Sequence, residues 1–155
     1  MTSADVTSPT GPVVFAYDGS ELAARAIRQA GAQLAVPRAA VVVCVWQPAD
    51  VGFSPVNGRH FDANDATEVH KAAEQTAAYG ASLAQSAGFD ATSVTIEDAP
   101  TWKGVTKAAA DVGASLIVVG THRHTGLIGH LGGSVASAII AHAATAVLVV
   151  HLPAN

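Results

Sequence analysis

The residues best suited to chemistry lie in a glycine-rich segment in the last third of the chain. An apolar run over 116–119 ends at Gly120, and a basic loop with four further glycines occupies 121–133. The next residues, 135–144, are rich in alanine and predict a helix. A helix start presents unpaired backbone N–H groups and a partial positive charge, and glycines let such backbone approach an anion closely. The sequence therefore predicts phosphate binding by the amides of Gly133, Ser134 and Val135.

Two of the candidate residues also have simpler structural roles. The Ser134 hydroxyl would add a bond to a phosphate or would cap the helix, and spacing alone favours neither role. Asp18 follows a predicted strand over 13–17, and its carboxylate would bond its own backbone in the turn Asp18-Gly-Ser20. That role is compatible with contacts to a ligand. Ser20 is predicted to cap the helix that follows.

Three histidines of the loop, His122, His124 and His130, suggest a metal site, because imidazole is a common metal ligand. No cysteine or carboxylate accompanies them within 121–133. Protein metal sites usually combine such ligands with histidine. We therefore expect no metal to be held by these side chains.

Alternating strands and helices are predicted around this segment. Residues 1–11 are expected to form a loose tail, 12–152 one domain, and 49–65 an irregular loop. The predicted strands cover 13–17, 41–46, 93–97, 116–119 and 146–151. The predicted helices run from Ser20 to a residue before Pro37, and over 66–87, 103–112 and 134–142.

This alternation predicts an α/β domain in which an open five-stranded parallel sheet carries helices on both faces. The nearly continuous valine of 41–46 is typical of a parallel strand covered on both sides. In such sheets ligands bind at the carboxyl ends of the strands, where the strand order reverses. The glycine-rich loop leaves the sheet at a carboxyl end, so it lies where a ligand cleft is expected.

The composition limits the remaining classes of function. The chain has 155 residues and a net charge of −4, so we expect no binding to nucleic acid or to anionic membranes. No apolar run approaches the roughly 20 residues that span a bilayer, and residues 1–10 lack the features of a signal peptide. Cys44 is the only cysteine, which fits a reducing compartment, and we expect the protein to be cytoplasmic.

The segment that begins at Gly120 resembles the nucleotide-binding signature of the universal stress protein family. The signature is glycine, two residues, glycine, nine residues, glycine, then serine or threonine. Its positions here are Gly120, Arg123, Gly133 and Ser134. The resemblance extends along nearly the whole chain after the first dozen residues, including 13–20 and 146–151. It implies an adenine nucleotide alpha hydrolase-like fold with strand order 3-2-1-4-5, in which the order reverses between the first and fourth strands.

The resemblance also implies which residues surround a nucleotide. It places the backbone of Val45 at the adenine edge, with Val119 and Gly120 completing that wall. It places Asp18 beside the ribose and the metal-bearing phosphates. The complete implied set is Ala16, Tyr17, Asp18, Val45, Val119, Gly120, His122, Arg123, Gly133, Ser134 and Val135.

Arg123 departs from the signature. Glycine at this position allows the backbone to pass close to the phosphates, and a non-glycine residue at positive φ would cost about 1 kcal/mol. The arginine side chain would block the phosphate site, replace backbone contacts with a guanidinium–phosphate pair, or point into solvent. We expect binding to persist with an altered preference for the triphosphate.

The resemblance implies a universal stress protein that binds ATP, ADP or AMP as a regulatory ligand, with Mg²⁺ held through the phosphates. Cyclic AMP remains an alternative adenine ligand. Two other functions stay open: a member without nucleotide that acts through protein partners, which Arg123 favours, and a weak ATP hydrolase. No catalytic residue is predicted. The resemblance also implies a homodimer through the last strand, 146–151, whose apolar edge invites pairing.

Overall fold

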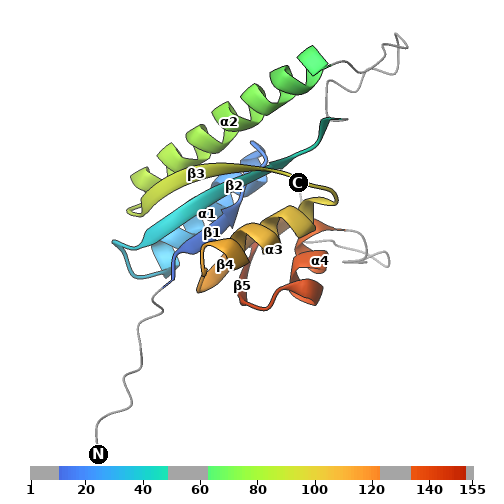
Figure 1. The fold of residues 1–155 in the computed structure, drawn as a ribbon. Helices are drawn as coiled ribbons and strands as arrows, with labels where there is room; N and C mark the ends of the chain where they lie inside the picture. Colours follow the sequence, from blue (N-terminus) through green and yellow to red (C-terminus); the bar gives the residue numbers. More distant parts are fainter. Residues whose placement is uncertain (1–10, 49–62, 123–133, 153–155) are drawn as a thin grey trace, which may run out of the picture.

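The chain folds as a parallel sheet between two layers of helices (Figure 1). The structure, a computed structural model, describes residues 11–48, 63–122 and 134–152. The elements, in chain order, are β1 (Val13–Ala16), α1 (Glu21–Gln33), β2 (Ala39–Trp46), α2 (Ala63–Ser86), β3 (Asp90–Glu97), α3 (Thr101–Asp111), β4 (Leu116–His122), α4 (Val135–His142) and β5 (Ala146–Leu152). The alternation confirms the predicted α/β class.

The five strands pair in the order β3-β2-β1-β4-β5, and each neighbouring pair is parallel. This confirms the strand order implied by the resemblance. The order reverses between β1 and β4, because β2 and β3 lie on one side of β1 while β4 and β5 lie on the other. A ligand cleft is therefore expected beside the carboxyl ends of β1 and β4.

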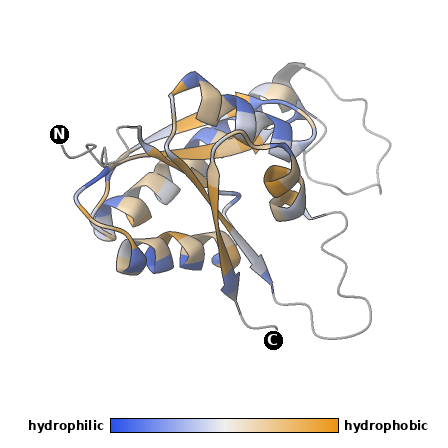
Figure 2. Ribbon diagram, turned by 90° about the horizontal axis from the view of Figure 1, so that it is seen from below, coloured by the Kyte–Doolittle hydropathy of each residue, from blue (hydrophilic) through white to orange (hydrophobic). Residues whose placement is uncertain are grey.

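The sheet separates two hydrophobic cores. Val13 and Phe15 of β1 pack with buried residues of α1 and α2, whereas Val14 packs with those of α3 and α4. In Figure 2 the central strands are hydrophobic, while the helices carry both hydrophobic and hydrophilic residues. Coverage on both faces explains why the strands read as nearly continuous apolar runs. None of the helices in the described part of the chain is both long enough and apolar enough to cross a membrane.

Two strands exceed their predicted bounds by three residues each. β4 continues to His122 instead of ending at 119, because residues 120–122 pair with 150–152 of β5. Gly120 therefore does not end the strand. β3 begins at Asp90 instead of 93, because it pairs with β2 from Ala39 onward. In both cases a neighbouring strand supplies hydrogen bonds that local sequence does not reveal.

The predicted tail and the predicted loop over 49–65 lie mostly outside the described residues. α2 begins at Ala63, so the last three residues of that predicted loop are helical. Gly11 packs closely against Gly113, since a Cβ at Gly11 would collide with the carbonyl oxygen of Gly113.

Hydrogen bonds join three segments at the amino end of the sheet. Arg38 Nη2 donates to Ser115 Oγ over 2.7 Å, and Ser115 Oγ donates to the Gly11 carbonyl oxygen, also over 2.7 Å. The Ser115 amide donates to the Pro12 carbonyl oxygen at 3.0 Å. This amino-end network ties the starts of β1, β2 and β4 together.

Candidate functional site

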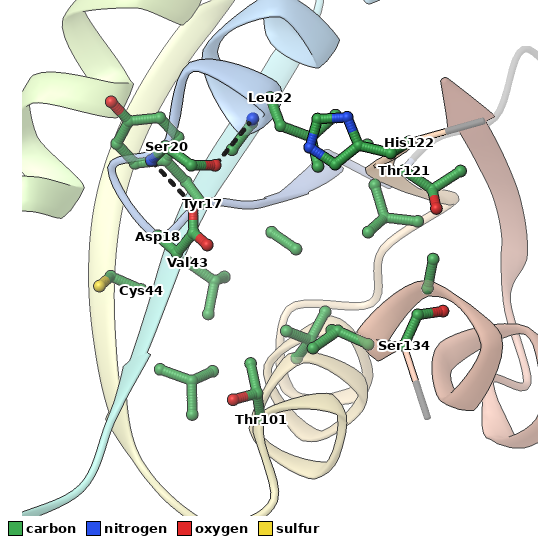
Figure 3. A pocket seen from close by; sticks show the side chains of 18 residues that line it. Tyr17, Asp18, Ser20, Leu22, Val43, Cys44, Thr101, Thr121, His122 and Ser134 are labelled. Carbon is green, nitrogen blue, oxygen red and sulfur yellow. Dashed lines mark hydrogen bonds between the residues drawn. The ribbon is translucent and has the colours of Figure 1, made fainter. Parts of the chain in front are cut away.

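A cavity of about 510 Å³ opens at the carboxyl ends of β1 and β4. Its walls come from the ends of β1, β2 and β4 and from the starts of α1, α3 and α4. Figure 3 shows the side chains arranged around this space. The cavity therefore lies at the reversal of strand order, where open parallel sheets bind their ligands.

Nine of the eleven predicted site residues lie in the described part of the chain, and all nine line this cavity. Those from the first half of the chain are Ala16, Tyr17, Asp18 and Val45. Those from the second half are Val119, Gly120, His122, Ser134 and Val135. The remaining two, Arg123 and Gly133, lie outside the described residues, as do His124 and His130.

The sequence analysis missed part of the lining. Thr101 was overlooked because α3 was predicted to begin at 103, whereas it begins directly after Pro100. Pro100 was an available signal, since proline is favoured at helix starts. Thr121 was assigned to a loop, but it is a strand residue that is 4% exposed. The other missed lining residues are Ser20, Leu22, Ala23, Val43, Cys44, Val105 and Ala136.

Asp18 begins the turn between β1 and α1. Its Oδ1 accepts a hydrogen bond from the Ser20 amide at 2.9 Å, as the turn interpretation predicts. Gly19 adopts a φ of +86°, which glycine tolerates best. Ser20 Oγ then accepts from the Ala23 amide at 3.1 Å, which confirms the predicted cap of α1. The turn thereby fixes the Asp18 carboxylate at the rim of the cavity, where Oδ2 lies outside this hydrogen bond.

Ser134 caps α4. Its Oγ accepts from the Ser137 amide at 3.0 Å and lies 2.8 Å from the Ser137 hydroxyl. The capping interpretation is therefore confirmed. The cap fixes the start of α4, and Ser134, Val135 and Ala136 at this start all line the cavity.

Tyr17 lines the cavity, and its ring packs into the core. Its side chain is 4% exposed, and a Cβ on Gly80 of α2 would lie 2.6 Å from its ring. Figure 3 shows the ring turned toward α2. Burial raises the pKa of the Tyr17 hydroxyl, with a further contribution from the neighbouring Tyr79. The ring is therefore a core group, packed on the α1 and α2 side of the sheet.

Gly120 brings α1 close to β4. A Cβ at Gly120 would lie 3.0 Å from the Leu22 carbonyl oxygen and 3.2 Å from the Ala26 Cβ. Glycine here lets helix and strand approach each other closely. Leu22 and Gly120 both line the cavity, so this approach also shapes it.

The lining combines apolar and polar side chains. The apolar members at the ends of strands and at α3 are Ala16, Val43, Val45, Val105 and Val119. The polar members are Asp18, Ser20, Thr101, Thr121, His122 and Ser134. A largely apolar cavity with a few polar groups suits a ligand that has a planar apolar part and a charged part. Of the described lining residues, Asp18 alone carries a carboxylate.

A parallel sheet of this order, with a cavity at its reversal point, defines an adenine nucleotide alpha hydrolase-like α/β domain. The model of the universal stress protein family matches residues 10–151. The chain therefore belongs to the universal stress protein family. No match is found among curated proteins.

Solved structures of the family share the fold. A universal stress protein in complex with cAMP is 24% identical, with a TM-score of 0.64 and coverage of 92% of this chain and 97% of that one. An Archaeoglobus fulgidus universal stress protein in complex with dAMP is 22% identical, with a TM-score of 0.60 and coverage of 90% and 96%. A family member from Burkholderia pseudomallei is 22% identical, with a TM-score of 0.64 and coverage of 95% and 98%.

Proposed function

We propose that this protein binds ATP or another adenine nucleotide in the cavity beside β1 and β4. The nucleotide acts as a regulatory or sensing ligand. The observation that carries the proposal is that the apolar strand ends and the start of α4 line one cavity. Two similar proteins, one in complex with cAMP and one with dAMP, support the adenine class.

In the proposed complex the adenine ring lies against the apolar side chains of Val45, Val105 and Val119, with its edge read by the backbone of Val45. The phosphates lie at the start of α4, where the amides of Val135 and Ala136 have no partner within the helix. The partial positive charge of a helix start favours this orientation over the reverse.

The proposed Mg²⁺ ion enters with the nucleotide. Mg²⁺ takes oxygen ligands and commonly combines phosphate oxygens with one or two carboxylates and water. Asp18 at the rim of the cavity offers a carboxylate of this kind, so the residues present fit the ion. The ion would neutralise phosphate charge.

Calorimetric titration with ATP, ADP, AMP and cyclic AMP tests the proposal. We expect heat of binding with at least one of these nucleotides in protein freed of carried-over ligand. An Arg123→Gly protein titrated in parallel measures how the arginine changes the preference among the phosphates. If none of the four nucleotides binds the native protein, the proposal is wrong, and the alternative of a family member acting through protein partners takes its place.

We further propose that the protein is a cytoplasmic homodimer joined through β5. β5 lies at the edge of the sheet formed by the described strands, so its outer backbone groups have no strand beside them. Residues 147–150 of β5 are valine and leucine, and an apolar edge of this kind favours pairing with a second strand. Native mass spectrometry should show twice the chain mass at micromolar concentration. A monomer under those conditions would contradict this proposal.

A further inference from the structure

A second hollow adjoins the cavity at the starts of α3 and α4. This outer hollow has a volume of about 490 Å³ and is lined by residues 100–102 and by Ser134, Val135, Ser137 and Ala138. Thr101, Ser134 and Val135 line both spaces. The two spaces therefore adjoin at these three residues.

Trp102 is the one aromatic side chain among the described residues that line the outer hollow. Its indole stacks on the imidazole of His142, with ring centroids 4.1 Å apart and ring planes within 11° of parallel. Trp102 also packs partly against the core under α3 and α4. These contacts hold the indole in place, so stacking a ligand ring on it would cost little side-chain entropy. Aromatic side chains held in this way bind bases through stacking.

We propose that the site takes a nucleotide whose phosphate chain ends in a second planar ring, a dinucleoside polyphosphate, with that second ring against Trp102. The inference rests on the proposed function, because a nucleotide with its phosphates at Ser134 and Val135 directs its phosphate chain toward residues shared by both spaces. Beyond them, the small side chains of Ser137 and Ala138 leave room for a ring, and the indole provides the attraction.

Two probes isolate the outer hollow. Adenosine tetraphosphate and diadenosine tetraphosphate carry the same number of phosphates and differ by the second adenosine. We expect the diadenosine compound to bind about ten times more tightly, as base stacking on an aromatic ring would produce. In Trp102→Leu the two dissociation constants should become nearly equal, while adenosine tetraphosphate binds as before. Ala138→Phe, which fills the outer hollow and keeps the indole, should have the same effect if Trp102→Leu fails to fold.

Trp46→Leu is the matched control. Trp46 lies in a separate hollow, stacked on His70 at a centroid distance of 4.9 Å, so its loss should leave the ratio of dissociation constants unchanged. In that variant Trp102 is the only tryptophan, and its fluorescence should be quenched by the diadenosine compound but not by adenosine tetraphosphate. Equal affinities in a native protein that binds adenosine tetraphosphate would overturn the inference and leave the proposed function intact. Failure to bind either compound would overturn the inference, and the proposed function would fall with it only if ATP, ADP, AMP and cyclic AMP also gave no heat of binding.

Discussion

The two ends of the parallel sheet are built in opposite ways. At the amino end, the Arg38 guanidinium, the Ser115 hydroxyl and the Gly11 carbonyl form a continuous chain of hydrogen bonds. At the carboxyl end, the strands and the helix starts enclose a cavity of about 510 Å³. Polar side chains therefore join distant segments at the first end, and at the second they bond within single turns beside open space.

The difference follows from the direction of the chain in β-α units. Each helix begins after the carboxyl end of a strand, so the unpaired N–H groups of helix starts gather at that end. At the amino end of the sheet the helices end, and short connections such as residues 112–115 lead into the next strand. Stability and ligand binding should therefore respond separately to substitutions at the two ends, except at Gly120, where the contacts of α1 with β4 also shape the cavity.

Gly120→Val should have the largest effect and should break this separation. The Cβ of the new side chain would lie 3.0 Å from the Leu22 carbonyl oxygen and 3.2 Å from the Ala26 Cβ. The two methyl groups of valine would need further space. Overfilling of this kind costs about 3 kcal/mol, and displacement of α1 should abolish nucleotide binding. Urea denaturation and calorimetry measure the two effects.

Gly113→Asn is the control for Gly120→Val. Gly113 lies toward the amino end with a φ of +61°, and a Cβ there would meet nothing within 4 Å. Asparagine tolerates this backbone conformation, so the loss of stability should stay below about 1 kcal/mol with binding unchanged. A Gly120→Val protein that is as stable as the control and binds nucleotide would show that α1 can move freely away from β4.

Ser115→Ala should lower stability and leave binding intact. The substitution removes the acceptor of the Arg38 guanidinium and the donor to the Gly11 carbonyl. Leaving such groups unsatisfied should cost about 2 kcal/mol. Arg38→Met should cost less, because Arg38 Nε is buried with no partner among the described residues and its desolvation opposes folding in the native protein. Equal losses for the two variants in urea denaturation would contradict this account of the amino-end network.

Ala16→Leu should weaken nucleotide binding and change stability less, the reverse of Ser115→Ala. Ala16 lines the cavity, so a larger side chain fills part of the space proposed for the nucleotide. We expect at least about a ten-fold loss of affinity, or about 1.4 kcal/mol, with the free energy of unfolding changed by less. Ala39→Leu makes the same substitution at an exposed position at the start of β2 and should change neither quantity. Unchanged affinity in Ala16→Leu would place the ligand elsewhere.

Local chemistry was sufficient to predict the cap at Ser20 and to offer a cap as one of two roles for Ser134, because a cap depends on residues three positions apart. The strand order came from the resemblance and is confirmed. The Arg38–Ser115 and Ser115–Gly11 bonds were not predictable, since they join residues 77 and 104 positions apart. Thr101 was also missed because of a contact between distant parts of the chain, since its place in the cavity depends on how α3 packs against the sheet.

Tyr17 could have been interpreted better from the sequence. Successive strand residues point to opposite faces. Phe15 packs on the α1 and α2 side, so alternation continued past the end of β1 predicts the same side for Tyr17 and the opposite side for Ala16. The structure has this arrangement. The Tyr17 ring therefore contributes to the core, while its neighbour Ala16 lies open to the cavity.

Tyr17→Phe should have the smallest effect on stability. It tests whether the side of the carboxyl end that faces α2 acts independently of the side that lines the cavity. Burial raises the pKa of the Tyr17 hydroxyl above its ordinary value of 10.0, and Tyr79 and Asp18 add to this. The unfolded chain therefore loses this proton first as the pH rises. The stability that depends on the neutral hydroxyl is complete below the unfolded pKa and is lost as the pH rises through the folded one.

Urea denaturation across that pH range checks the difference between native protein and Tyr17→Phe. The variant should lose stability less steeply with pH above about pH 10, while its nucleotide affinity at neutral pH stays unchanged because the ring faces α2. Tyr79→Phe keeps the buried Tyr17 hydroxyl and removes one contribution to its raised pKa, so its profile should lie between those of native protein and Tyr17→Phe. Identical slopes for native protein and Tyr17→Phe would mean that burial of this hydroxyl does not control alkaline unfolding. A loss of nucleotide affinity in Tyr17→Phe would mean that the α2 side of the carboxyl end takes part in binding after all.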